Sequence, residues 1–89
     1  MTSVFVMTDV VGSTALWEDH VAAMRESLEQ HDRIVGGALT GAGGRVFKHT
    51  GDGMIAVFEE ADRAVAGALH AVEALTGVAW GATGPLQVR

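Results

Sequence analysis

Two aspartates follow or interrupt apolar segments of this chain, where carboxylates could hold a divalent metal ion. Asp9 comes at the end of the apolar segment "SVFVMTDV", and Asp52 lies in "TGDG", between "RVFKHT" and "MIAVF". Carboxylate oxygens are preferred ligands of Mg²⁺, which proteins usually hold with one or two carboxylates plus substrate phosphates. Because Asp-Gly is also a common hairpin turn, Asp52 taken alone is more typical of a turn residue than of a metal ligand.

The segment "DVVGST", residues 9–14, leads from the first apolar run into a helical pattern. A helix N-terminus offers unpaired backbone N–H groups and the positive end of the helix dipole, both of which favour phosphate. Ser13 or Thr14 is a good N-cap, so a plain cap and turn is the alternative interpretation. The chain has no Gly-Lys-Ser/Thr of a P-loop. Metal-binding carboxylates beside a phosphate loop would indicate phosphoryl chemistry on a nucleotide.

Alternating and helical patterns predict the elements that must position these residues. Apolar residues from Trp17 to Leu39 recur at helical spacing and predict one helix that ends at "GAGG", with His31 packed on its apolar stripe. "RVFKHT" and "MIAVF" predict a hairpin around "TGDG", and "LQVR" predicts the start of a fourth strand. A second helix is expected in residues 59–77, with one face formed by Ala61, Val65, Ala68, Val72 and Leu75.

The element order strand, helix, hairpin, helix, strand is that of an α+β, ferredoxin-like (split βαβ) fold. We expect an antiparallel sheet with helices on one face, and Asp9 beside Asp52, because the first strand would pair with the hairpin. The uncovered face should expose Phe5 and Met7. If Phe47 points at the helices, Val46 and Lys48 also lie on the open face.

Composition limits the class of protein. The 89 residues suffice for one domain or less, and a net charge of −5 argues against nucleic acid and anionic membranes as partners. The absence of cysteine excludes disulfides and thiolate metal sites. The N-terminal apolar run is too short for a signal peptide or a membrane span. We therefore expect a cytoplasmic protein.

The pair "FVMTDVVGST" and "GGRVFKHTGDGMIAVF" resembles the catalytic domain of class III adenylyl/guanylyl cyclases, most closely the bacterial type. The resemblance covers nearly the whole chain. It implies that Asp9 and Asp52 bind two Mg²⁺ or Mn²⁺ ions, with the Val10 carbonyl as a further ligand, and that Lys48 reads the purine. The residues that it assigns to the substrate besides Lys48 are Val11, Gly12, Ser13, Thr14 and Gly51.

The same resemblance implies conversion of ATP, in preference to GTP, to cyclic AMP and pyrophosphate. In that family the sites form between two antiparallel protomers, which implies a homodimer or pairing with another cyclase domain, Lys48 serving the site of the other chain. The family's second half carries a ribose-orienting asparagine and a transition-state arginine, and this chain reaches only Arg89. Residues 1–89 therefore correspond to the N-terminal half of the nucleotide-cyclase palm, truncated after the start of the fourth strand.

We accordingly expect the chain to be inactive alone. The alternative is a catalytically inactive remnant, or a dimerisation or regulatory module that pairs with a complete cyclase.

Overall fold

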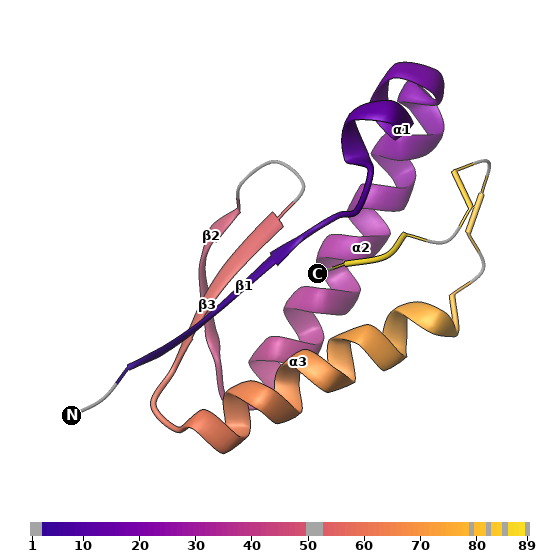
Figure 1. Ribbon diagram of the computed structural model, residues 1–89. Coiled ribbons are helices and arrows are strands. Elements are labelled where there is room, and N and C mark those ends of the chain that lie inside the picture. Colours follow the sequence, from indigo (N-terminus) through magenta and orange to yellow (C-terminus); the bar gives the residue numbers. More distant parts are fainter. Residues whose placement is uncertain (1–2, 50–52, 79, 82, 85, 89) are drawn as a thin grey trace.

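The computed structural model describes residues 3–49, 53–78, 80–81, 83–84 and 86–88, and the elements follow one another in the expected order (Figure 1). They are β1 (Val4–Asp9), α1 (Ser13–Asp19), α2 (Val21–Gly41), β2 (Arg45–His49), β3 (Gly53–Phe58) and α3 (Ala61–Thr76).

The strands form one antiparallel sheet of order β1-β3-β2, with β3 in the centre. In the pairing of β1 with β3, Val4 lies opposite Phe58 and Asp9 lies opposite Gly53. This order and the helices on one face confirm the α+β, ferredoxin-like palm. Since β1 pairs directly with the second hairpin strand, its carboxyl end lies beside the start of β3.

The core lies between the sheet and the helices α2 and α3, which Figure 1 shows crossing one face of the sheet. Alternate residues of β3 supply Met54, Ala56 and Phe58, and α2 supplies Val35 and Leu39, all buried. Full burial of a large apolar side chain contributes roughly 1.5–3 kcal/mol, so this single layer provides most of the stabilisation.

The other face of the sheet is open, as expected. Phe5 is 55% exposed, Met7 69% and Phe47 51%. The rings of Phe5 and Phe47 meet edge to face with their centroids 6.1 Å apart. We call Phe5, Met7 and Phe47 the open-face cluster.

The expected orientation of β2 is wrong, because Val46 packs against the core and Phe47 faces outward. The register explains the difference: Val46 pairs with Ala56 and Lys48 with Ile55, so Phe47 is the extra residue of a β-bulge. A strict alternation of faces does not hold across such a bulge.

The prediction of one continuous first helix is also wrong. His20, with φ −142° and ψ 58°, separates α1 from α2. The N-cap of α1 is Gly12 rather than Ser13 or Thr14, and no side chain caps this helix. The prediction for His31 is confirmed: its ring is fully buried, and Nδ1 lies 2.9 Å from Oδ1 of Asp32. No helix within the described ranges is long and apolar enough to cross a membrane.

The apolar face expected for α3 is not the face that the helix buries, although Leu75 belongs to both. The residues of α3 that are buried are Ala64, Gly67, Ala71 and Leu75. Val65 and Val72 are exposed instead. A Cβ on Gly67 would lie 3.0 Å from the Ala42 Cβ and 3.2 Å from Cζ of Phe58. The helix therefore turns its small residues inward because it lies too close to its neighbours for larger ones.

The predicted fourth strand is represented among the described residues by one antiparallel bridge, between Val10 and Val88. The Val11 N–H donates to the Gln87 carbonyl at 2.8 Å, and Leu86 is buried. The segment 86–88 thus continues the sheet beyond the end of β1.

We predict that Gly44→Ala lowers the free energy of unfolding by about 1–3 kcal/mol, the usual cost of overpacking a core. A Cβ at this position would lie 2.4 Å from Cζ of Phe58, whose side chain is buried. Gly37→Ala is the matched control, since a Cβ there meets nothing within 4 Å. It should raise stability by about 0.5–1 kcal/mol through helix propensity. Urea unfolding followed by circular dichroism measures both, and equal effects would contradict this packing.

Candidate functional site

Asp9 is the last residue of β1, half-buried and opposite Gly53, the first residue of β3. Asp52 precedes Gly53 in the sequence, but Gly51 and Asp52 lie outside the described residues. The structure therefore confirms that the end of β1 and the start of β3 adjoin. The separation of the two carboxylates stays a prediction.

Val10 anchors the strand end next to Asp9. Its side chain is 2% exposed and packs with Met24 and Leu86 in a second, smaller apolar cluster. Leu16 and Trp17 of α1 pack against the same cluster. Because α1, α2 and the C-terminal segment all contribute to this cluster, Val10 and the backbone of the neighbouring Asp9 are fixed in position.

The loop that leads from β1 to α1 is built from Val11 and Gly12. Gly12 adopts φ 68° and ψ 26°, the left-handed conformation that glycine enters without steric cost, and its carbonyl accepts the Leu16 N–H at 3.3 Å. Ser13 and Thr14 follow in the first turn of α1. The chain thereby passes from β1 into α1 through a turn of only two residues, Val11 and Gly12.

The C-terminal segment holds this loop in place, which the sequence did not indicate. The Val11 N–H donates to Gln87, and Ser27 Oγ of α2 lies 2.8 Å from Thr83 Oγ1. The Trp80 indole N–H donates to the Leu75 carbonyl at 3.3 Å. The first two contacts join residues more than fifty positions apart in the sequence, and the third joins a loop to the end of α3. No local sequence pattern could therefore have predicted that the C-terminal segment holds the loop after β1.

Lys48 lies in β2, where its backbone pairs with Ile55. Met7 of β1 pairs with the same residue from the other side of β3. Strand β3 therefore lies between Lys48 and β1. The residue of β3 that pairs with Lys48, Ile55, lies two positions after Gly53, which pairs with Asp9. Its side chain lies outside the described part of the structure.

The only support for a metal site here is the chemical type of the expected ligands, which are all oxygen atoms. Within the described ranges, no three His, Asp or Glu side chains lie close enough together to hold an ion. The donors expected from the sequence are the carboxylates of Asp9 and Asp52 and the Val10 carbonyl. All are oxygen donors, the type that Mg²⁺ prefers. The set fits a hard divalent cation, but only Asp9 has a described side chain.

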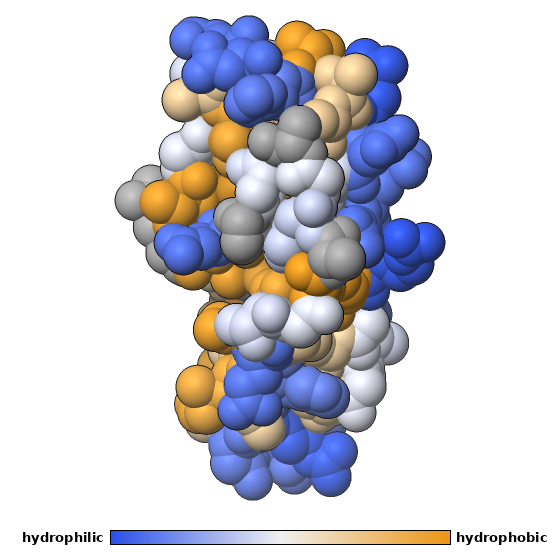
Figure 2. Space-filling view, turned by 90° about the vertical axis from the view of Figure 1, so that its right-hand side faces the viewer, coloured by the Kyte–Doolittle hydropathy of each residue, from blue (hydrophilic) through white to orange (hydrophobic). Residues whose placement is uncertain are grey.

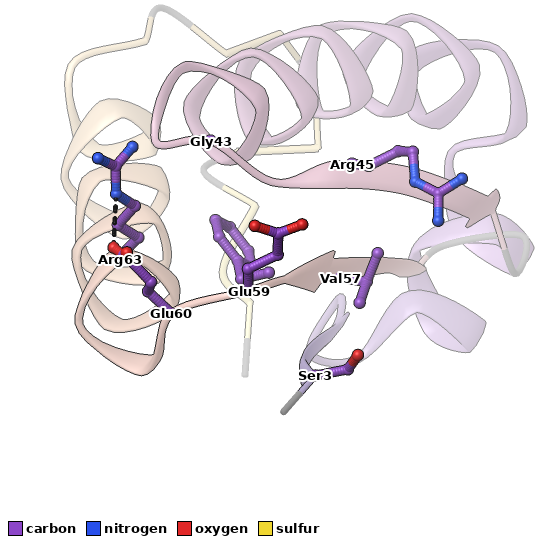
Figure 3. Close-up of a pocket in the computed structure, with 8 residues that line it drawn as sticks. Ser3, Gly43, Arg45, Val57, Glu59, Glu60 and Arg63 are labelled. Atoms are coloured by element: carbon purple, nitrogen blue, oxygen red, sulfur yellow. Dashed lines mark hydrogen bonds and ion pairs between the residues drawn. The ribbon is translucent and has the colours of Figure 1, made fainter. Parts of the chain in front are cut away.

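A pocket of about 450 Å³ lies at the opposite end of the sheet (Figure 3). Residues at its rim include Ser3 before β1, Arg45 at the start of β2, and Glu59 and Arg63 after β3. Arg63 Nε donates to Glu60 Oε2 at 3.0 Å, and both side chains are mostly exposed, so this ion pair contributes little. Asp9 is the last residue of β1, whereas Ser3 of this pocket lies just before its first residue. The pocket is therefore separate from the candidate metal site.

The chain shares sequence with one cyclase over part of its length. It is 39% identical over 54 residues to the adenylate cyclase of Schizosaccharomyces pombe, a segment that covers 61% of this chain and 3% of that protein. No model of a protein family matches the chain.

Solved structures share its fold. An adenylate cyclase of Trypanosoma brucei in its monomeric state matches with a TM-score of 0.85 and 25% identity, over 89% of this chain and 34% of that one. An adenylate/guanylate cyclase/hydrolase from Silicibacter pomeroyi matches with a TM-score of 0.75 and 25% identity, over 99% and 56%. For a bacterial light-regulated adenylyl cyclase the TM-score is 0.79 at 23% identity, over 84% and 41%, which shows the fold alone.

The chain therefore spans between about a third and somewhat more than half of these solved chains. The sequence likeness to an adenylate cyclase and the fold shared with adenylate and guanylate cyclase structures confirm that the chain resembles part of a class III nucleotide cyclase catalytic domain.

Proposed function

We propose that this chain supplies the metal-binding half of a nucleotide cyclase site that converts ATP to cyclic AMP and pyrophosphate. The pairing of Asp9 with Gly53 carries the proposal. Paired Cα atoms of antiparallel strands are 4.5–5.5 Å apart and consecutive Cα atoms 3.8 Å, so chain connectivity limits the Cα separation of Asp9 and Asp52 to about 10 Å. Two carboxylates can share one or two ions across that distance.

Asp9, Asp52 and the Val10 carbonyl would hold the ions. Ions held by these groups would supply positive charge beside the ribose 3′-hydroxyl and the triphosphate of a bound nucleotide. The contribution of the protein here is positional. Asp9 is half-buried at a strand end, and the next residue is fixed in an apolar cluster, so its carboxylate loses little freedom when it binds.

The loop of Val11, Gly12, Ser13 and Thr14 would receive the triphosphate. The Val11 N–H already donates to Gln87, so the donors available to phosphate are the N–H groups that follow. Helix geometry leaves the first N–H groups of α1 without partners inside the helix, and they carry the positive end of its dipole. Gly51, which precedes Asp52, would complete the substrate contacts.

Lys48 would contact the purine, and its match to the family position favours ATP over GTP. The family arrangement assigns it to the site of the other protomer. An open-face cluster of Phe5, Met7 and Phe47 supports such pairing, because exposed apolar patches usually mark partner surfaces. The same patch supports the second candidate function, a dimerisation or regulatory module that joins a complete cyclase.

The first prediction from this proposal is that Asp9→Asn and Asp52→Asn each weaken Mn²⁺ binding at least about tenfold, since even outer-shell substitutions cost that much. Mn²⁺ electron paramagnetic resonance measures free ion directly. Asp62→Asn, an exposed carboxylate in the first turn of α3, is the control and should leave the affinity unchanged. Identical titrations for the unmodified chain and both variants would reject the metal site.

The second prediction concerns activity. The 89-residue chain with Mn²⁺ and ATP should release no more cyclic AMP than its Asp9→Ala variant, because the resemblance assigns the transition-state arginine to the other half of the domain. Loss of a single electrostatic stabiliser typically costs 10²–10³-fold, or about 2.7–4 kcal/mol. Product detection by mass spectrometry is suitable. An Asp9-dependent rate would mean that another residue replaces the arginine, and Arg45 and Arg89 would be tested first.

The third prediction is that the open face mediates self-association. Phe47→Glu introduces a charge next to Phe5 and should weaken the assembly measured by sedimentation at least about tenfold, since each buried aromatic contributes roughly 1.5–3 kcal/mol. Leu69→Glu, on the outer side of α3, tests whether any effect is specific to this face. An unchanged sedimentation profile for Phe47→Glu would contradict a role for the open face.

A further inference from the structure

Two buried polar atoms have no hydrogen-bond partner among the residues that the structure describes. They are Oγ1 of Thr8, on β1, and Nε2 of His31, on α2. The whole His31 side chain is buried. Most buried polar groups in proteins are paired, either with another protein group or with an ordered water molecule. Two unpaired atoms in so small a domain therefore indicate that something else binds to them.

Thr8 and His31 lie at the boundary between the two apolar clusters. Thr8 is two residues before Val10, which belongs to the smaller cluster together with Met24. Because the register of β1 is regular, Thr8 shares the inward face of the strand with Val10. On the buried face of α2, His31 lies between Met24 of the smaller cluster and Val35 of the larger one. Both polar side chains thus separate one apolar cluster from the other.

A third polar side chain lies one helical turn from His31. Ser27 is four residues before it, on the same face of α2, and is buried. Its Oγ lies 2.8 Å from Thr83 Oγ1, and the Thr83 hydroxyl donates to the Gly84 carbonyl at 2.9 Å. Since a hydroxyl has only one proton, the Ser27 hydroxyl is the donor to Thr83. The Ser27 oxygen therefore keeps a lone pair for a further donor.

The C-terminal segment covers α2 at this point. It lies on the right in Figure 1 and so faces the viewer in Figure 2, where it crosses the middle of the molecule as a band of intermediate hydropathy. Trp80 packs against both apolar clusters, and Thr83 is bonded to Ser27. The boundary between the clusters is therefore enclosed by β1, α2 and this segment.

The bond at the other ring nitrogen determines what His31 can accept. Nδ1 lies 2.9 Å from Oδ1 of Asp32, and a carboxylate accepts hydrogen bonds without donating. Nδ1 therefore carries the proton, and Nε2 of the neutral ring is an acceptor. Nε2 and the Ser27 oxygen both require a donor, whereas the Thr8 hydroxyl has a proton to donate. A water molecule, with two donors and two lone pairs, can satisfy all three.

We infer that one water molecule is bound inside the protein between Thr8, Ser27 and His31. It accepts a hydrogen bond from the Thr8 hydroxyl and donates to Nε2 of His31 and to Oγ of Ser27. Three hydrogen bonds are usual for a buried water. The site joins the residue before Asp9 to α2 and, through Ser27, to the C-terminal segment. It does not depend on the proposed cyclase activity, because none of its three ligands is a candidate metal or substrate ligand.

Nuclear magnetic resonance tests the site directly. Long-range ¹H–¹⁵N spectra at about pH 8, where an imidazole is normally neutral, should show the His31 proton on Nδ1. Relaxation dispersion of water ¹⁷O counts long-lived internal water molecules. The count should fall by one in the double variant Thr8→Val/His31→Leu, which leaves the water a single partner. Thr8→Ser keeps the hydroxyl and is the matched control, in which the count should not change.

A double-mutant cycle provides the second measurement. Thr8→Val and His31→Leu should each raise the equilibrium constant of unfolding about threefold to tenfold, since each leaves the water with an unmet hydrogen bond. The double variant should raise it at least about threefold less than the product of the two factors, because the water is released and both partners are apolar. Loss of the bond to Asp32 occurs in both arms of the cycle and cancels. Urea unfolding followed by circular dichroism gives the constants.

Three results would overturn the inference. They are a His31 proton on Nε2 instead of Nδ1, an internal-water count that is the same in the double variant as in the unmodified chain, and unfolding constants whose changes simply multiply. The first result needs no substitution, so it can be obtained even if one of the variants fails to fold.

Discussion

The antiparallel pairing of β1 with β3 is the constraint on which the remaining structure depends. It sets Val4 opposite Phe58 and Asp9 opposite Gly53, so one register fixes both ends of the sheet. A shift by one residue would turn Phe5 and Met7 into the core and expose Val4 and Val6, which now pack against it. The burial of β-branched residues on one face therefore stabilises the same register that sets Asp9 opposite Gly53, the residue that follows Asp52 in the sequence.

The strands, their order along the chain and the open face could be predicted because each leaves a local pattern in the sequence. The orientation of β2 could not, because the bulge at Phe47 adds one residue, and a period of two then assigns the wrong face. The inner face of α3 failed for another reason. Hydrophobicity favoured Val65 and Val72, but close packing against Phe58 and Ala42 selected Ala64 and Gly67. Steric fit between distant elements overrode hydrophobicity.

The candidate site was predictable to a similar extent. Asp9 lies at a strand end, as expected from the apolar segment that precedes it, whereas Gly12 takes the N-cap position that was expected for Ser13 or Thr14. The anchoring by Gln87 and Val88 was not predictable, because it pairs residues about eighty positions apart in the sequence. The loop at the proposed triphosphate site thus depends on contacts from the other end of the chain. Unfolding of the segment 86–88 would disturb the loop before it disturbed β1.

A chain of this size has little core with which to stabilise such a loop. A domain of 60–150 residues buries only about 60–70% of its unfolded surface, and here one face of the sheet and one stripe of α3 keep large apolar side chains in solvent. Burial of either surface by a partner would stabilise the folded state through mass action. The open-face cluster includes Phe5 and Met7 of β1, the strand that ends in Asp9. Association through the open face would therefore also stabilise the strand that ends in this carboxylate, so assembly and the proposed metal binding should be coupled.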